Sequence, residues 1–407
     1  MTQHRTSLAL AFLAATGAGY ACVESSNELV STGAASGPGA TSGGDDGFNR
    51  EAMLQHLGEV VIQREAQTFT EATAALKSAT AAYRSSLSSD DQDEARAAWR
   101  EAMNVWQRLE VMQIGPAGAS DSALGGADLR DEIYSWPLVN RCRVDQELVE
   151  GAYQNEGGFT EEAVNVRGLD ALEYLLFSEG TDNACAPQND INAQGSWSAI
   201  EGELDQRRAD YAATAASILD AHAGQLRNAW EGSFLPAYVG AGTDTSVYPT
   251  QRDALNATSD ALFYLEKMTK DAKLGVPLAI IDCGTAGCPD VPESKVARHS
   301  KQQVQQNIAG FRALFTGGVG EDALGFDDWL GAAGAGDVAD AMLADLGSAE
   351  AALLAIDEPT LAEALTEDPE SVTALYDALS ELVVHLKTDF VTVLDLELPS
   401  AVEGDND

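Results

Sequence analysis

An apolar helix with two carboxylates set into it is the segment of this chain best suited to chemistry. It runs Gly168-Leu-Asp-Ala-Leu-Glu-Tyr-Leu-Leu-Phe177. Asp170 and Glu173 stand three residues apart, so on a helix they are neighbours on one face. An ionised carboxylate among Leu, Tyr and Phe is costly to bury without a cation or a hydrogen-bond donor. The spacing therefore predicts a site for a positive ion, with Asp170 and Glu173 as metal ligands.

A structural interpretation is also open for the first of these carboxylates. Asn165 and Gly168 suit the start of a helix, and an acidic side chain in the first turn favours the helix dipole. That position explains Asp170 without any ligand. It does not explain Glu173, which has leucines at most of the neighbouring positions.

Glu110 is a third carboxylate in an apolar context. Trp99, Met103, Trp106 and Glu110 follow one another at i, i+4, i+7 and i+11, so they form one stripe of a helix that should face the core. Glu110 is therefore a candidate third metal ligand. The alternative is that it lies at the helix end and bonds a backbone amide or an Arg.

Trp136, Arg167 and Lys273 are candidate neighbours of this site. The Trp136-Pro137 pair is expected to shape a turn. A cation from Arg167 or Lys273 could pair with the buried carboxylates, and the site would then be a salt-bridge network rather than a metal site.

The motifs of common hydrolases and phosphate-binding proteins are missing. The chain contains no HExxH, the usual metallopeptidase helix, and no Gly-x-Ser-x-Gly elbow. Gly317-Gly-Val-Gly320 lacks the Lys and the flanking strand of a phosphate-binding loop. The five histidines are scattered, and His385 has the apolar flanks of a satisfied core residue rather than of a ligand.

The chain is strongly acidic. Its 407 residues carry 65 Asp and Glu against 24 Lys and Arg, a formal net charge of -41. Nucleic-acid binding depends on a basic surface, so this composition argues strongly against that class of partner. The charge would repel anionic lipid surfaces and favour cations, and it equally suits an ordinary solvated acidic surface.

The first 22 residues resemble an export signal. Arg5 precedes an apolar run from Leu8 to Ala18, which is too short to span a bilayer as a permanent helix. The following Gly19-Tyr-Ala-Cys22 resembles a bacterial lipoprotein cleavage site, although Gly19 stands where such sites usually carry an aliphatic residue. We predict that Cys22 becomes a lipidated N-terminus, with plain secretion as the alternative. The protein would then lie in the periplasm, outer membrane or cell surface, attached only through that lipid.

Four cysteines remain after the predicted lipidation site. They are Cys142, Cys185, Cys283 and Cys288, and an even set in an exported protein suggests two disulfides. Four cysteines allow three pairings. The short loop from Cys283 to Cys288 favours a local bridge there and a second bridge between Cys142 and Cys185. Zinc binding is the alternative, but no two of these cysteines have CxxC spacing.

From about residue 50 onward the chain has a helical pattern. Ala and Leu are abundant, β-branched runs are scarce, and apolar residues recur every three or four positions. Ser89-Asp-Asp-Gln92 has the form of a capping box and is predicted to start the second helix. Helices are predicted at 50–87, 90–113, 160–178, 197–231, 251–272, 295–315, 336–356 and 369–392, with Val391–Leu394 continuing the last helix.

These helices predict an all-α fold of two related helical bundles packed side by side. The bundles would span about 49–235 and about 236–400. Ala171–Leu175 is echoed by Ala261–Leu265, which fits either an ancient duplication or chance recurrence in Leu- and Ala-rich helices. The remaining segments are the signal at 1–22, a flexible Ser- and Gly-rich tether at 23–48 and an acidic tail at 401–407.

The segment Gly168-x-Asp-x-x-Glu173 resembles the Gly-x-His-x-x-Glu motif of the imelysin-like family, which includes exported peptidase-like and iron-uptake lipoproteins. The order of further stretches supports this resemblance over roughly residues 50 to 400. They are Glu110–Gly115, Tyr134–Leu138, Leu262–Gly275, Asn307–Thr316 and Leu396–Pro399.

The resemblance implies an all-helical fold of two related bundles with a site where they meet. The motif His is Asp170 in this chain. Zinc peptidases need neutral imidazole ligands, so a carboxylate here favours hard cations such as iron(III), calcium, magnesium or manganese.

The resemblance supports three functional hypotheses. The first is an exported, lipid-anchored protein that binds a metal ion, such as iron, or a metal-loaded ligand at an acidic interhelical site during iron uptake. The second is a metallopeptidase of the imelysin type, weakened by the missing His. The third is a structural lipoprotein with a degenerate site and an envelope protein as its partner.

Overall fold

Helices form the regular secondary structure of this protein in the computed structural model, which describes residues 46–281 and 292–402. No strand occurs within those ranges, and the all-α prediction is confirmed. None of their helices combines the length and the apolarity needed to cross a membrane. The predicted signal peptide, Cys22, most of the tether, Cys283, Cys288 and most of the acidic tail lie outside the described residues.

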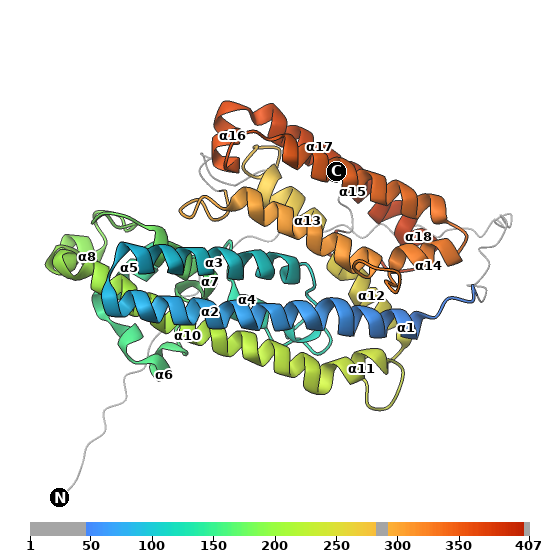
Figure 1. Cartoon of the computed structure of the whole chain (residues 1–407), viewed down its shortest axis with the longest axis horizontal. Helices are drawn as coiled ribbons and strands as arrows, with labels where there is room; N and C mark the ends of the chain where they lie inside the picture. Colours follow the sequence, from blue (N-terminus) through green and yellow to red (C-terminus); the bar gives the residue numbers. More distant parts are fainter. Residues whose placement is uncertain (1–45, 282–291, 403–407) are drawn as a thin grey trace, which may run out of the picture. The chain divides into compact units, whose positions relative to one another are not determined.

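Three long helices dominate the N-terminal half. The first is continuous from α1 (Arg50–His56) through a π-helical segment, Leu57–Ile62, into α2 (Gln63–Ser86), as predicted for 50–87. It packs against both α3 (Ser89–Glu110) and α10 (Leu204–Ala229), which lie beside it in Figure 1.

The start of α3 differs by one residue from the predicted capping box. Ser88, not Ser89, is the N-cap, and its hydroxyl accepts a hydrogen bond of 3.2 Å from the backbone N–H of Asp91. Leu87 lies in the left-handed region at φ 52°, which lets the chain reverse between α2 and α3. The apolar stripe of α3 faces the core as predicted, since Trp99, Met103 and Trp106 are fully buried.

The segment between α3 and α10 is less regular than its sequence pattern predicted. Only α7 (Gly168–Phe177) and a 3₁₀ turn, Val164–Val166, form within the predicted helix 160–178. The residues from Thr160 to Ala163 form turns and irregular structure instead. The short helices here are η2 (Gly115–Ala117), α4 (Leu129–Ile133), α5 (Arg141–Glu150), η3 (Ala152–Gln154), α6 (Glu156–Phe159), α8 (Asp190–Ala193), α9 (Ser196–Ile200) and η5 (Glu201–Glu203).

The remaining helices follow the predictions for 197–231, 251–272, 295–315, 336–356 and 369–392, with shifted ends and additional short helices. Helix α10 runs on through a π-helical segment, Trp230–Phe234, into α11 (Leu235–Val239). The later elements are α12 (Gln251–Leu262), the π-helix η7 (Leu265–Gly275), α13 (Ser300–Thr316), α14 (Phe326–Ala332), α15 (Gly336–Ala355), α16 (Leu361–Glu367), α17 (Pro369–His385), η9 (Leu386–Phe390) and α18 (Val391–Val393).

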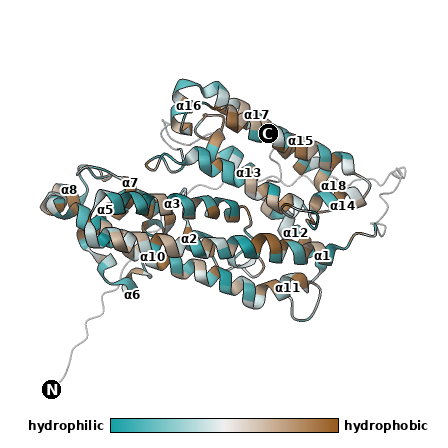
Figure 2. Cartoon of the chain, viewed as in Figure 1, coloured by the Kyte–Doolittle hydropathy of each residue, from teal (hydrophilic) through white to brown (hydrophobic). Residues whose placement is uncertain are grey.

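Contacts between helices far apart in the sequence form the core. Helix α15 packs on α17, η7 packs on both α13 and α17, and α13 packs on α3. Figure 2 shows apolar and polar residues alternating along these helices, as expected for amphipathic helices that bury one face. The division into two related bundles stays a prediction.

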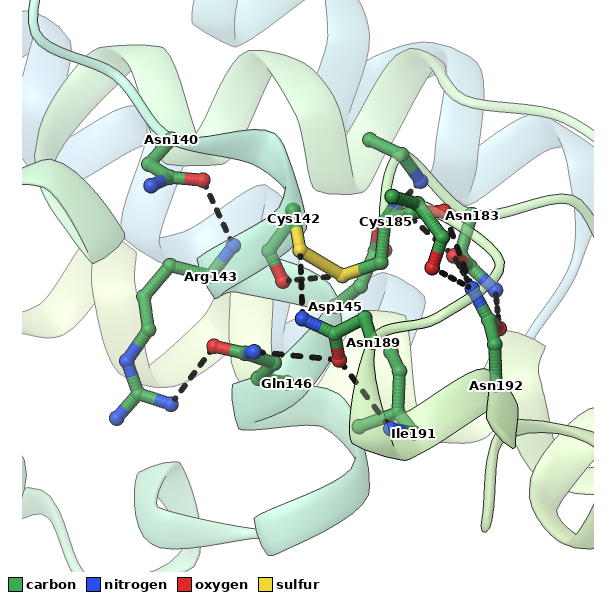
Figure 3. Close-up of a disulfide and its surroundings, with 12 residues drawn as sticks. Asn140, Cys142, Arg143, Asp145, Gln146, Asn183, Cys185, Asn189, Ile191 and Asn192 are labelled. Atoms are coloured by element: carbon green, nitrogen blue, oxygen red, sulfur yellow. Dashed lines mark hydrogen bonds between the residues drawn. A yellow bond between two sulfur atoms is a disulfide. The ribbon is translucent and has the colours of Figure 1, made fainter. Parts of the chain in front are cut away.

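A disulfide joins Cys142 of α5 to Cys185 in the segment before α8, as predicted (Figure 3). Beside it, the Asp145 carboxylate accepts hydrogen bonds of 2.7 Å from the backbone N–H of Ala184 and 3.0 Å from the hydroxyl of Tyr174. The bridge and this carboxylate together attach the irregular segment after α7 to α5.

Candidate functional site

Helix α7 begins where only glycine fits. Gly168 has φ +79°, and a Cβ atom there would lie 2.6 Å from the carbonyl oxygen of Ile133. The close approach of α7 to the end of α4 therefore depends on Gly168. Two residues later, Asp170 occupies the first turn of the helix, which is the position that the dipole interpretation requires. Its side chain is nevertheless buried.

Asp170 receives hydrogen bonds but forms no direct ion pair with the residues that the structure describes. The Ser135 hydroxyl donates to Oδ2, and the backbone N–H of Ala171 donates to Oδ1 at 3.1 Å. Burial raises the pKa of Asp170 to about 6, and these hydrogen bonds and the more distant charge of Arg130 offset only part of that rise.

Glu173 is compensated by backbone amides. The N–H groups of Val296 and Ala297, just before α13, each donate to Glu173 Oε1 at 2.9 Å. Burial raises the pKa of Glu173 to about 7, against the lowering effects of these amides and of Arg141, while the charge of Asp170 adds to the rise. Glu173 is therefore buried, and no guanidinium or ammonium group of residues 46–281 or 292–402 pairs with it.

Glu110, the third predicted ligand, lies fully buried at the end of α3 and is paired with an arginine. The Nε and Nη2 groups of Arg130 donate to Glu110 Oε1 at 3.1 and 2.9 Å. Burial and then the charges of Glu110 and Glu293 raise the pKa of Tyr264 well above its usual value. The pairing of Glu110 with Arg130 matches the alternative interpretation, in which an arginine bonds Glu110.

Lys273 neutralises a carboxylate that the sequence did not single out. Its Nζ lies 3.0 Å from Oε2 of Glu293, donates to Asn307 Oδ1 at 2.8 Å and also bonds Gln107 Oε1. Tyr134 donates to Glu293 Oε1 at 2.7 Å. Glu293 follows Pro292 in a non-helical segment, so no periodicity identified it in advance.

Three consecutive residues connect these groups. The Tyr134 hydroxyl bonds Glu293, the Ser135 hydroxyl bonds Asp170, and the Trp136 carbonyl accepts from Arg130 at 2.7 Å. The Lys273 Nζ also lies 5.7 Å from the centre of the Trp136 ring. The stretch Tyr134–Leu138 carried part of the family resemblance, so a signal for these residues was present in the sequence.

The three predicted neighbours of the site lie in different surroundings. Trp136 and Lys273 belong to this buried network. Arg167 instead pairs with Glu132 at 2.7 Å and donates to the Thr160 carbonyl. It forms no hydrogen bond or ion pair with Asp170 or Glu173 among the residues that the structure describes.

The histidines among the described residues lie outside this network. His299 is buried, accepts or donates a 2.8 Å hydrogen bond with Asn104, and has its pKa lowered to about 4 by burial, so its imidazole is neutral. His385 was expected in the core, and that expectation is wrong. It is half-buried and faces Asp389 at 2.8 Å and Asp345 at 3.6 Å, because its helix face lies at the edge of the core.

The side chains at this site meet the requirements of a metal-ion site only in part. Within residues 46–281 and 292–402, no group of three or more His, Cys, Asp or Glu side chains is arranged to hold a metal ion. Asp170 and Glu173 offer hard oxygen donors. Neither carboxylate forms a direct ion pair with another residue of those two ranges. Such a pair suits an ion that keeps other ligands, from water or from an organic chelator.

Comparisons with known proteins agree with the fold. The family model for imelysin, peptidase family M75, matches residues 62–386. A structure described as an iron-regulated protein A precursor from Parabacteroides distasonis ATCC 8503 is similar, with a TM-score of 0.65 and 17% identity, over 86% of this chain and 95% of the other. An imelysin-like protein from Psychrobacter arcticum 273-4 has the same TM-score and identity, over 86% and 96%. No curated protein matches the sequence.

Proposed function

Because this chain belongs to the imelysin family, we propose that it is an exported, lipid-anchored binding protein of iron uptake. It holds a metal ion, or a metal-loaded ligand, at Asp170 and Glu173. The description of one similar structure as an iron-regulated protein precursor supports the setting. The Cys142–Cys185 disulfide supports export, since disulfides persist mainly in oxidising compartments.

The observation that carries the proposal is a difference between four buried carboxylates. Glu110 and Glu293 have cationic partners in Arg130 and Lys273, whereas Asp170 and Glu173 rely on hydroxyl and amide donors. A bound cation would displace their protons and supply the missing positive charge, and metal binding releases protons for that reason. Glu110 is held by Arg130, so it serves as a structural neighbour rather than a ligand.

Metal titration tests this function. We would titrate purified wild type with ferric nitrilotriacetate, calcium and zinc by calorimetry, and repeat it on Asp170→Asn plus Glu173→Gln. The wild type should bind one ion per chain, and the double variant should bind it at least roughly tenfold more weakly, a loss of about 1.4 kcal/mol. Glu101→Gln, an exposed change on α3, is the matched control and should bind like wild type. Equal binding by the double variant would overturn the proposal.

A metallopeptidase of the imelysin type remains the second candidate, favoured by the family to which the chain belongs. Incubation with unfolded protein substrates, with and without chelator, separates the two functions. Cleavage that the chelator abolishes would favour the peptidase. Neither binding nor cleavage, together with an envelope protein recovered by crosslinking, would favour a structural lipoprotein.

Membrane fractionation of wild type and Cys22→Ser tests the lipid anchor, which the variant should lose.

A further inference from the structure

A cavity beside α12 includes neither Asp170 nor Glu173 among its lining residues. It has a volume of about 550 Å³, within the usual range for small-molecule sites. Most of its lining comes from residues 113–124, from α12 with the residues that follow it, and from residues 397–402. One face of α12 forms a wall, because the lining positions on it recur every three or four residues: Asp253, Asn256, Ala257, Asp260, Ala261 and Tyr264.

Asn256 gives this cavity a buried hydrogen-bond donor that lacks a protein acceptor. The residue is only 8% exposed, and its remaining surface faces the cavity that it lines. Its Oδ1 accepts a 3.2 Å hydrogen bond from the backbone N–H of Glu397, which fixes the plane of the amide and turns Nδ2 away from that backbone. Nδ2 keeps accessible surface and donates to no residue that the structure describes. Buried polar groups normally have a partner, so Nδ2 is free to recognise an acceptor on a ligand.

A second side-chain amide lines the cavity from the segment after α3. Gln113 is half-buried, and its side chain forms no hydrogen bond with another residue of 46–281 or 292–402. An amide both donates and accepts, whereas the exposed carboxylates of Asp260 and Glu397 only accept. Leu124 and Pro399 add apolar surface to the lining. The cavity therefore offers hydrogen-bond donors and acceptors together with apolar contacts.

We propose that this cavity binds a neutral polyhydroxylated molecule of the sugar class. A hydroxyl oxygen accepts from Asn256 Nδ2 while its O–H donates to the carboxylate of Asp260, one helical turn along the same face. Leu124 and Pro399 contact the C–H faces of the sugar ring.

The same donors and acceptors disfavour charged ligands. An ammonium group only donates, so it would leave Asn256 Nδ2 without an acceptor. A carboxylate or phosphate group accepts, but Asp260, Glu397 and the net charge of -41 repel it. The site is independent of the proposed metal site.

Three probes that share a six-membered ring test the class of ligand. We would titrate wild type with methyl β-D-glucoside, cyclohexylmethylamine and D-glucuronate, and follow binding by saturation-transfer NMR of the probe. The glucoside should bind with a Kd below about 10 mM, and at least roughly tenfold more tightly than either charged probe. A weaker glucoside Kd, or a charged probe that binds within tenfold of the glucoside, would overturn the proposal.

Asn256→Asp tests the donor that carries the proposal. It keeps an oxygen to accept from the Glu397 backbone and replaces the Nδ2 donor with a second acceptor, so glucoside binding should weaken at least roughly tenfold. Asn155→Asp makes the same chemical change at the exposed N-cap of α6 and is the matched control. Its glucoside affinity should equal that of wild type. Unchanged binding by Asn256→Asp would refute the site.

A second variant tests the cavity without altering α12. Ser122 is an exposed lining residue, and Ser122→Trp should block glucoside binding by filling the cavity, so binding that survives it would also refute the site. The unfolding midpoint by circular dichroism establishes that each variant is folded. Asp170→Asn plus Glu173→Gln should keep full glucoside affinity, which separates this result from the metal titration.

Discussion

At the scale of single residues, the buried carboxylates show two ways to keep a negative charge in a protein interior. Arg130 and Lys273 supply direct cations to Glu110 and Glu293. From the part of the chain that the structure describes, Asp170 and Glu173 receive only hydroxyl and amide hydrogen bonds, and burial raises the pKa of both. A carboxyl group with a raised pKa holds its proton up to a higher pH, so a cation competes with that proton most strongly in mildly acidic solution.

Glu173→Gln should change how stability depends on pH. The pKa of Glu173 rises from 4.5 to about 7 on folding, so the native state binds the proton more tightly than the unfolded chain. Ionisation therefore penalises the native state, with no penalty below pH 4.5 and the full penalty above about pH 7. A Gln side chain keeps the acceptor for Val296 and Ala297 and cannot ionise.

The free energy of unfolding, measured by denaturant titration at several pH values, checks this. The stability of the Gln variant relative to wild type should increase across that window by on the order of 3 kcal/mol. Glu101→Gln serves as the control and should show a flat difference. A difference for Glu173→Gln that does not vary with pH would contradict the raised pKa.

At the scale of helices, the network depends on how closely α13 approaches α3. A Cβ atom on Gly310 of α13 would lie 2.5 Å from the Arg108 carbonyl oxygen of α3. Next to this point, the Asn307 amide donates to the Gln107 carbonyl at 2.8 Å. Lys273 bonds both side chains from the π-helix η7. The absence of a side chain at Gly310 therefore permits the contacts that hold Lys273 beside Glu293.

Gly310→Ala should destabilise the protein although alanine favours helices. The added methyl group overlaps backbone atoms that cannot rotate away, which typically costs about 1–3 kcal/mol. Gly347→Ala in α15 is the matched control, because a Cβ atom there meets no atom within 4 Å. That variant should gain up to about 1 kcal/mol from helix propensity. Thermal or denaturant unfolding measures the stability of both variants. Equal changes in stability would mean that α3 and α13 can move apart at little cost.

At the scale of the whole molecule, charge sets the background for every site. The net charge of -41 creates self-repulsion in the compact state and attracts cations without selecting among them. Selection of a metal ion would therefore depend on local structure, such as Asp170 and Glu173 of α7, whose hydrogen-bond donors among the described residues are hydroxyl and amide groups rather than cations.

Salt should stabilise this protein. Raising sodium chloride from about 0.01 M to about 0.15 M shortens the Debye length from roughly 30 to 8 Å, which screens repulsion among surface carboxylates. We expect a higher unfolding midpoint at the higher salt concentration, measured by circular dichroism. Choline chloride, whose cation is too bulky for a carboxylate pair, should give a similar shift. A lower midpoint in both salts would show that attractive ion pairs outweigh the repulsion.

Much of the helical architecture could be predicted because helix periodicity is local. The apolar stripe of α3 and the shared face of Asp170 and Glu173 follow from spacings of three and four residues. Predictions were less accurate where turns interrupt that pattern, as before Gly168, whose position reflects contact with Ile133. The imelysin-like motifs also indicated the family, since their order extends over most of the chain.

The sequence by itself thus determined an all-helical, strongly acidic chain with two carboxylates on one face of α7. Only the tertiary structure decided which acidic side chains pair with a cationic side chain. Glu110 pairs with Arg130, Glu293 pairs with Lys273, and Glu173 accepts hydrogen bonds from the amides before α13. The reason is physical: neighbours within a helix are set by its pitch, whereas partners from separate segments are set by side-chain packing and close backbone approach, for which no local spacing exists.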